Sequence, residues 1–312
     1  MLLTLSEDMY FGTAYVNDII AKTPLNAGIE LGEKLLHKLQ NRRRNLSLIF
    51  SDRSFEKESN LIYGLQERLG KSFPMMGACV SDNMRFLKTR LYFNQEVFTD
   101  SATGILWGGK INFGIGIKHG WNPLGKPRTV TRSEGNIVYE IDGESAAKIY
   151  EDYFACNISQ LQRELKYISV LYPIGIYLSQ EEEYLVRNIL SIEENGSLVF
   201  LGNVKQGSQI RLMIGTKEST LSATKQAILE AKKNIATKID FLLVFDSISR
   251  YILLRKEAPL ELEIIKDSVD KNTPIIGLYT YGEQAPLREI SYQGQIHFHN
   301  QTIAILAIGT QE

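Results

Sequence analysis

The feature that most constrains the fold of this chain is a repeat of its own sequence at an offset of 200 residues. Residues 77–109 align with residues 277–309 without a gap, and five of the matched positions are Gly77, Phe98, Ile105, Leu106 and Gly109, which fall on Gly277, Phe298, Ile305, Leu306 and Gly309. Upstream of each copy stands a short apolar segment, "LSLIFSD" or "LLVFDS", with a helical pattern after it. A repeated order of this kind predicts two related α/β modules.

The spacing of apolar residues predicts the helices and strands of these modules. Helices are expected over residues 26–43, 54–69, 142–157, 217–235 and 259–271, and hairpins over "RLYFNQEVFT" and "LVRNILSIEENGSLVFLGNV". Asp142 or Ser145 is the expected cap of the third helix, and Asn195-Gly196 is the expected two-residue turn of the second hairpin. The predicted fold class is α/β (mixed α+β), with mixed sheets flanked by helices. A join near Asp142 would give domains over 1–142 and 143–312.

Composition is typical of a soluble globular protein, with 44% apolar residues, 23% charged residues and a net charge of −1. That charge provides no basic field for nucleic acid. Cys79 and Cys156 are the only cysteines, which fits a reducing cytoplasm. The apolar run Tyr167–Leu178 contains Pro173 and falls short of the ~20 residues that span a bilayer. The N-terminus lacks the basic start of a secretory signal. A cytoplasmic protein without membrane insertion is therefore expected.

Three basic or glycine-rich segments suggest phosphate binding at first sight. Arg42–Arg44 is interpreted instead as the last turn of a helix, where cations suit the helix dipole. "GWNPLGKP" (Gly120–Pro127) has Pro127 where a phosphate loop needs Ser or Thr, and a strand pattern follows it. In "GIGIKHG" the glycines sit inside an alternating strand, where they allow another backbone to approach closely. No nucleotide site is expected in these segments.

Polar residues follow the apolar segments of both modules. In the second module they are Arg250, Tyr281, Glu283, His299, Asn300 and Thr302, and their first-module counterparts are Ser81, Asp82 and Asn83. Charged groups beside buried strands need partners, so Arg250 and Glu283 form either a structural ion pair or part of a ligand site. A small zwitterion, such as an amino acid, suits this mixture of donors and acceptors.

Other chemistries are each suggested by one or two residues. His297 and His299 leave the same face of a strand, but no third metal ligand accompanies them, so no metal is expected. His119 is either the axial ligand of a haem or a hydrogen-bonded loop residue. Ser247, at the end of a buried strand, is either a hydrolase nucleophile beside a histidine or a capping residue.

Four segments resemble the FIST family (F-box and intracellular signal transduction proteins) in both its N- and C-terminal domains. They are "HGWNPLGKPRTVTRSEGNIVYEIDGESAAKIYEDYF", "LLVFDSISR", "YTYGEQAP" and "HFHNQT", and the similarity extends over nearly the whole chain. Two departures from the family pattern stand out. A cysteine that often precedes the position of Arg250 is missing, and the N-terminal domain is a shortened form without a "GCSTxG"-like loop.

The resemblance implies a sensory module that binds a small molecule and acts through a signalling partner. Some bacterial members of the family bind haem and respond to nitric oxide. The leading hypothesis is a non-enzymatic ligand-binding protein of bacterial-type signal transduction, without a cofactor. A haem-based sensor using His119 and a hydrolase using Ser247 remain the alternatives.

Overall fold

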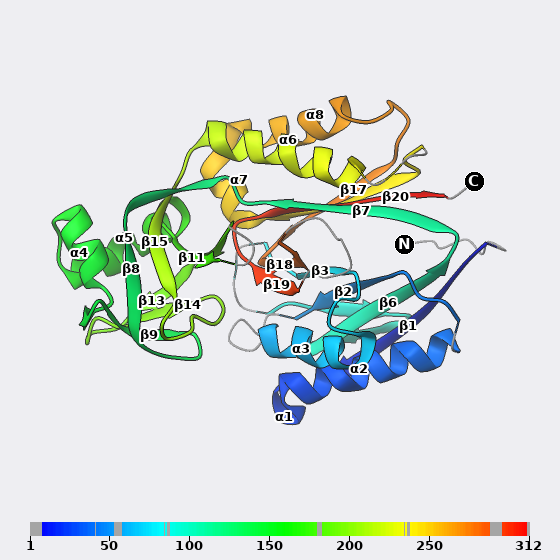
Figure 1. The fold of residues 1–312 in the computed structure, drawn as a ribbon, viewed down its shortest axis with the longest axis horizontal. Coiled ribbons are helices and arrows are strands. Elements are labelled where there is room, and N and C mark those ends of the chain that lie inside the picture. Colours follow the sequence, from blue (N-terminus) through cyan, green and yellow to red (C-terminus); the bar gives the residue numbers. More distant parts are fainter. Residues whose placement is uncertain are drawn as a thin grey trace.

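Two β-sheets packed face to face form the main body of the fold (Figure 1). This computed structural model describes residues 8–40, 42–52, 58–83, 85, 88–179, 183–233, 235, 238–287 and 295–310. The first sheet has six strands in the order β1 (Met9–Asn17), β6 (Ser101–Gly109), β2 (Leu46–Ser51), β3 (Met75–Cys79), β18 (Gly282–Pro286) and β19 (Ile296–His299). The second has four, in the order β17 (Ile275–Thr280), β16 (Phe241–Ser247), β20 (Ile303–Thr310) and β7 (Ile111–Lys118).

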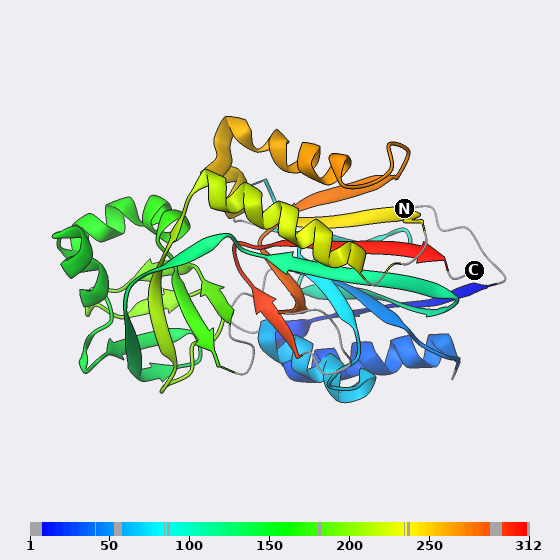
Figure 2. The ribbon, with the colours of Figure 1, turned by 45° about the horizontal axis from the view of Figure 1, so that its top comes forward.

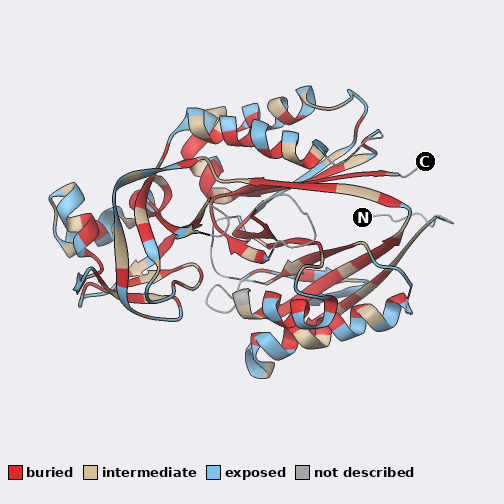
Figure 3. Ribbon diagram, in the orientation of Figure 1, coloured by how far each residue is buried: buried red, intermediate tan, exposed pale blue. Residues whose placement is uncertain are grey.

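Helices cover the outer face of each sheet, so the body has four layers (Figure 1). The first sheet carries α2 (Pro24–Leu39) and α3 (Glu58–Leu69), and the second carries α6 (Lys217–Lys233) and α8 (Pro259–Asp267). The central core lies between the sheets and includes Leu48, Trp107, Ile115, Leu243 and Leu306. In Figure 3 the strands are buried along much of their length, whereas buried and exposed residues alternate along the helices, as amphipathic helices require.

Residues 121–215 form a separate lobe beside this body (Figures 1 and 2). Its strands are β8 (Trp121–Glu134), β9 (Ile137–Ile141), β10 (Glu144–Ser145), β11 (Ile174–Leu178), β12 (Glu183–Arg187), β13 (Ile189–Ile192), β14 (Leu198–Phe200) and β15 (Gln209–Gly215). Two helices, α4 (Lys148–Phe154) and α5 (Ile158–Leu171), help to enclose an apolar core of its own. The lobe is therefore stabilised by its own core. In the chain it is an insertion between β7 and α6.

The strand order confirms two related modules with mixed sheets. β6-β2-β3 in the first sheet corresponds to β20-β16-β17 in the second, and in each trio the first pair is antiparallel and the second parallel. Ile49 lies opposite Gly104 as Phe245 lies opposite Ala304. The offset of 200 residues seen in the sequence thus relates the last strand of one module to the last strand of the other.

An edge strand and a covering helix extend the correspondence. β1 pairs with β6 as β7 pairs with β20, and the next long helix, α2 or α6, packs on that edge strand. The second module also lends β18 and β19 to the first sheet, where β18 pairs with β3. The modules therefore interlock through their sheets. The domain boundary near Asp142, a residue that lies within the lobe, stays a prediction.

Gly114 and Gly116 let β7 lie directly against α6, the close approach expected for this glycine-rich strand. A Cβ at Gly116 would stand 1.9 Å from the carbonyl oxygen of Ala227, and one at Gly114 would stand 2.0 Å from that of Ala231. Both obstacles are backbone atoms, so a side chain at either position would push α6 away from the sheet.

Gly116→Ala should therefore lower the free energy of unfolding by about 1–3 kcal/mol, as measured by urea denaturation. Gly277→Ala is the matched control, because its Cβ would meet the nearest atom, the carbonyl oxygen of Val244, at an ordinary 3.5 Å. Equal losses in the two variants would show that close packing of α6 on β7 is not the cause.

Two helix expectations were wrong for local reasons. α2 ends at Leu39 and Gln40 adopts a left-handed conformation, so Arg42–Arg44 lie in the connection to β2 and not in a helix. The helix expected over 142–157 begins only at Lys148, since β10 and the turns beside it occupy the preceding residues. Each expectation extended a helical apolar pattern beyond the point where the backbone turns.

Both predicted hairpins form. β4 (Leu91–Phe93) pairs with β5 (Glu96–Phe98), and β13 pairs with β14. The second turn is longer than expected, because Asn195 does not share the positive φ of Gly196. The Asn195 side chain instead accepts a hydrogen bond from the backbone N–H of Ser197 at 3.0 Å, which is the local turn chemistry of asparagine.

Candidate functional site

Arg250 is fully buried in α7 (Ile248–Leu254), between two carboxyl groups. Its Nε lies 3.1 Å from Glu261 Oε1 and 3.0 Å from Asp246 Oδ1. Its Nη1 donates to the carbonyl oxygen of His119 at 2.7 Å, and its Nη2 donates to a further carbonyl and a hydroxyl. Every guanidinium nitrogen is therefore engaged by the protein. Arg250 pairs with Asp246 and Glu261, and not with Glu283, which was one of the two alternatives from the sequence.

Glu283, in β18, is a core carboxyl with neutral partners. Its Oε1 accepts a hydrogen bond from Thr280 Oγ1 at 2.5 Å, and its Oε2 accepts one from Thr302 Oγ1 at 2.6 Å. Burial raises the pKa of Glu283 to about 8, because desolvation outweighs the opposing effect of these hydrogen bonds. The side chain is consequently mostly protonated at neutral pH and presents no charge to a ligand.

His299 and Asn300 lie where the lobe meets the body. His299 Nε2 is 2.9 Å from the carbonyl oxygen of Ala285, and burial lowers the pKa of the imidazole, so a neutral ring donates this hydrogen bond. Asn300 Oδ1 accepts a hydrogen bond from the backbone N–H of Asn188, in the lobe, at 3.1 Å. Both predicted site residues thus make contacts that hold the fold together.

Asp82 and Asn83 follow β3 of the first module. They lie near the end of β17, the corresponding strand of the second module. The Tyr281 hydroxyl donates a hydrogen bond to Asp82 Oδ1, and the Ser81 hydroxyl donates to the carbonyl oxygen of Tyr279 at 2.6 Å. Asn83 adopts a left-handed backbone conformation with φ of 58°. The counterparts expected from the repeat are therefore neighbours, with Asp82 already engaged by Tyr281.

A cavity of about 440 Å³ opens beside the Arg250 cluster, between α8 and the parallel strands β16 and β17. Its polar lining comes from Asp246, Glu261, Tyr251 and Tyr279, and its apolar lining from Val244, Ala258, Pro259, Leu262, Ile265, Ile275, Leu278 and Ile303. Ligands of open α/β sheets bind near the carboxyl ends of parallel strands, which is the part of this cavity that Asp246 and Tyr279 line. An apolar wall with a few convergent polar groups is the usual composition of a small-molecule site.

The two carboxyl groups at this cavity are not fully satisfied by the protein. Asp246 is 7% exposed and Glu261 is 3% exposed. Among the described residues, Glu261 Oε2 has no hydrogen-bond partner, and Asp246 Oδ1 has none beyond its 3.0 Å ion pair with Arg250 Nε. Burial, and then the neighbouring Glu261 carboxylate, raise the pKa of Asp246 although Arg250 opposes the change. One guanidinium thus faces two carboxyl groups, which favours a ligand that brings donors and positive charge.

Tyr251 and Tyr279 provide an aromatic part of the wall. Their rings meet edge to face with centroids 5.2 Å apart. Burial raises the pKa of Tyr279 to about 12, so its hydroxyl stays protonated under ordinary conditions. Aromatic faces attract cations, and these rings can therefore assist the carboxyl groups in holding an ammonium group.

Glu261, Tyr251 and Tyr279 were missed by the sequence analysis, and only Glu261 carried a usable signal. In "PLELEII" Glu261 stands four residues before the buried Ile265, which places it on the buried face of the helix. A carboxyl on such a face needs a cationic partner, and Arg250 is eleven residues earlier (261 − 250). The tyrosines share no pattern that distinguishes them from other surface aromatics.

The geometry gives little support to the other predicted chemistries. Within the described part of the chain, the Ser247 hydroxyl makes no hydrogen bond to a histidine, while its backbone N–H donates to Thr302. His119 Nδ1 accepts a hydrogen bond from the Trp121 N–H at 2.9 Å, and Nε2 lies 3.6 Å from Glu183.

The cavity beside His119 measures only about 10 Å³. Nδ1 of His119 is already engaged by Trp121 and Nε2 faces Glu183, so these residues do not fit a haem. No group of three or more His, Cys, Asp or Glu suited to a metal occurs among the described residues. The helices of the described segments include none with the length and apolar character needed to cross a membrane.

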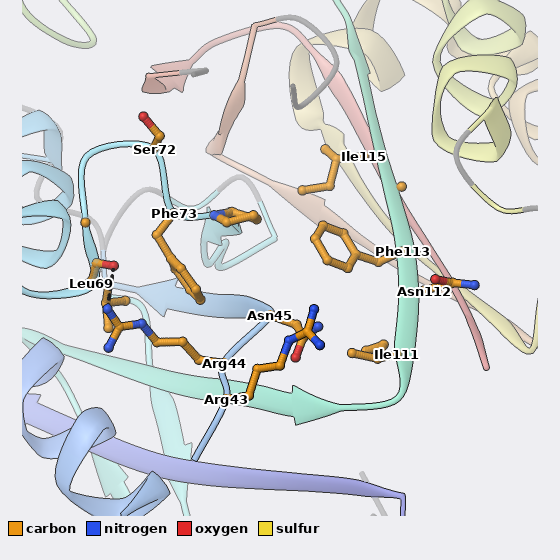
Figure 4. Close-up of a pocket in the computed structure, with 13 residues that line it drawn as sticks. Arg43, Arg44, Asn45, Leu69, Ser72, Phe73, Ile111, Asn112, Phe113 and Ile115 are labelled. Atoms are coloured by element: carbon orange, nitrogen blue, oxygen red, sulfur yellow. Dashed lines mark hydrogen bonds between the residues drawn. The ribbon is translucent and has the colours of Figure 1, made fainter. Parts of the chain in front are cut away.

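A cavity of about 670 Å³ lies between the connection that precedes β2 and the edge strand β7 (Figure 4). Arg43 extends into it beside Asn45, whereas Arg44 turns toward Leu69 and lies 5.5 Å from the centre of the Phe73 ring. Both arginines are exposed to solvent. Exposed cations are already hydrated, so these arginines gain little free energy from a bound anion. The cavity beside Asp246 and Glu261 has buried charged groups and is therefore the stronger candidate for a ligand site.

Fold and site together define a protein of two interlocked α/β modules, an inserted lobe and a pocket of ligand size. The chain belongs to the FIST family: the FIST N domain matches residues 1–144 and the FIST C domain matches residues 146–286. FIST domains are associated with sensory roles in signal transduction.

Two further similarities were found. An uncharacterized protein of Methanocaldococcus jannaschii is 24% identical over 249 residues, which cover 74% of this chain and 47% of that protein. The chain thus spans about half the length of this curated relative. The solved structure of cyanuric acid hydrolase aligns over 98% of this chain and 69% of its own, with 7% identity and a TM-score of 0.33, a score too low to indicate a shared fold.

Proposed function

We propose that the chain is a sensory protein whose cavity at β16, β17 and α8 binds a small amine-bearing molecule with an apolar body. The observation that carries this proposal is the presence of two buried carboxyl groups, Asp246 and Glu261, that line an apolar cavity with only Arg250 to balance them. Two ionised carboxyls buried together are costly, so the raised pKa of Asp246 favours a proton on the pair when the cavity is empty. An ammonium group can replace that proton, because it supplies both a positive charge and hydrogen-bond donors.

The same arrangement limits how an amino acid would bind. Arg250 has no free nitrogen, so it cannot serve as the usual clamp for the carboxylate of a ligand. An amino acid would instead place its ammonium group against Asp246 and Glu261, with its carboxylate directed away from them. Amines without a carboxylate should therefore bind more tightly than the corresponding amino acids.

A bound ligand would act on a surface that a partner protein can contact. Ile276, Leu278 and Tyr279 of β17 are exposed apolar residues, and Leu278 and Tyr279 also line the cavity. In the described part of the chain β17 is an edge strand of its sheet, and edge strands are where a partner strand can pair. We infer that a ligand in the cavity changes the positions of the exposed β17 side chains. A separate signalling protein that contacts this strand would then receive the signal.

Isothermal titration calorimetry with phenethylamine, its neutral analogue 2-phenylethanol and phenylalanine tests the proposal. Phenethylamine should bind most tightly, and Glu261→Gln should weaken it about 10- to 100-fold, the usual cost of losing a charge-assisted hydrogen bond. Glu263→Gln, an exposed position on the same helix, should leave the affinity unchanged. Equal affinity for the amine and the alcohol would contradict the proposal.

The affinity for the amine should also fall as pH is lowered. Asp246 has a raised pKa, so protons compete with the ammonium group for the carboxyl pair at lower pH. Titrations of the wild-type chain at several pH values, compared in buffers of different ionisation enthalpy, should show proton release on binding. Binding that is independent of pH would mean that the carboxyl pair does not receive the amine.

A further inference from the structure

A second cavity, of about 220 Å³, lies where the lobe meets the main body. The lobe contributes residues of β11 and β12 and of the 203–208 segment, and the body contributes residues of α3 and β19. The polar members of its lining are Tyr63, Arg187, Asn203, Lys205, Ser208, Gln295 and His297. No aspartate or glutamate is among the described residues that line it.

Arg187 is the unusual member of this set, because it is a charged residue of which only 3% is exposed. Its Nε donates to the carbonyl oxygen of Asn203 at 3.2 Å, and its Nη1 donates to those of Val186 and Phe298, both at 3.0 Å. Carbonyl groups fix the orientation of the guanidinium but do not neutralise it. In the described part of the chain Arg187 has no ion pair. Burial accordingly lowers the pKa of Arg187 to about 10.

The surrounding backbone is shaped to admit this guanidinium. Gly202 has a φ of 112°, and a Cβ at that position would stand 3.0 Å from Arg187 Nε. The carbonyl oxygen of Phe298, from β19 of the body, accepts a hydrogen bond from an arginine of the lobe. Arg187 therefore lies at the contact between the lobe and the body, where the absence of a side chain at Gly202 leaves room for its guanidinium.

We propose that this cavity binds a small oxyanion, a carboxylate or a phosphate group, with Arg187 as its anchor and Lys205 as a second cation. A buried guanidinium without a counter-ion costs free energy, and a planar oxyanion is the partner that guanidinium groups bind best. The size of the cavity restricts the ligand to a few heavy atoms beyond the anionic group. Because residues of both parts line the cavity, the anion would strengthen the contact between lobe and body.

This site is independent of the amine site proposed above, since the two cavities share no lining residue. Its charge is also of the opposite sign. An oxyanion should therefore compete for neither Asp246 nor Glu261, and the failure of one proposal leaves the other intact. The larger cavity of Figure 4 is a weaker candidate for the same chemistry, because Arg43 and Arg44 are exposed to water.

Calorimetric titration of the full chain with inorganic phosphate, with succinate and with the neutral diamide succinamide tests the proposal. At least one of the two oxyanions should bind saturably, and succinamide should not. Arg187→Gln should weaken the binding about 10- to 100-fold, the range for loss of a charge-assisted hydrogen bond. Lys205→Gln should cause a smaller but measurable loss, and Lys225→Gln, an exposed position on α6, should cause none.

Lys205 is exposed, so its variant should fold normally and decides the matter even if Arg187→Gln does not fold. The proposal is overturned if neither oxyanion binds at millimolar concentration, or if succinamide binds as well as succinate. It is equally overturned if Lys205→Gln, or a folded Arg187→Gln, retains wild-type affinity. Phosphate binding alone or succinate binding alone supports it and identifies which oxyanion the cavity accepts.

Discussion

Replacing Arg250 by methionine should lower the free energy of unfolding by about 3–5 kcal/mol, the largest loss that we expect from a single substitution in this chain. Methionine keeps much of the side-chain volume but removes the charge. Asp246 and Glu261 would then remain buried beside each other without a cation. The carbonyl oxygen of His119 would lose its donor as well. Urea denaturation followed by circular dichroism measures this loss.

Two comparisons separate this effect from the ordinary cost of changing an arginine. Arg163→Met, at an exposed position of α5, should change stability by less than about 0.5 kcal/mol. In the Arg250→Met background, neutralising the pair with Asp246→Asn and Glu261→Gln should recover part of the loss, because no buried carboxyl group then lacks its cation. A loss of stability that is unchanged in the triple variant would contradict the electrostatic explanation.

Glu283→Gln should make the stability of the chain less dependent on pH. The pKa of Glu283 is raised from 4.5 to about 8, so the folded chain holds a proton over that interval which the unfolded chain releases. The stabilising contribution of this proton is complete below pH 4.5 and is lost as pH rises through about 8. Between these values the wild type should lose on the order of a few kcal/mol that the glutamine variant does not lose.

The measurement is a series of urea unfolding curves from acid to mildly alkaline pH for both proteins. His299, whose pKa is lowered by burial, destabilises the fold as pH falls, but it does so equally in both and therefore cancels in the comparison. Glu263→Gln serves as the exposed control and should keep the wild-type profile. Parallel profiles for wild type and Glu283→Gln would show that this carboxyl is ionised in the folded chain.

Much of the fold could be predicted from the sequence, because its signals are local. The 200-residue offset, the two hairpins and the close approach at Gly114 and Gly116 each depend on a pattern within one segment or between two similar segments. The errors arose where the backbone turns without a strong signal. The helix expected from Asp142 illustrates this, since β10 and its turns occupy the start of that segment.

The candidate site could be predicted only in part. Arg250 and Glu283 were recognised as charged groups that need partners, but Arg250 pairs with Asp246 and Glu261, while Glu283 is held by Thr280 and Thr302. Asn300 became part of the contact between lobe and body, and His299 bonds to Ala285 within the first sheet. The residues predicted as a single pocket therefore lie apart: Arg250 lies beside the cavity, and the others make structural contacts.

The sequence by itself determined the two modules and the order of strands and helices along the chain, because periodicity and repetition act within the segments that carry them. Only the tertiary structure decided which polar groups meet. The lobe is inserted between β7 and α6, and the second module lends two strands to the first sheet, so residues far apart in the chain become neighbours. The course of the chain in three dimensions therefore decides which charged groups pair. Burial then sets the pKa of each carboxyl and the charge of each cavity.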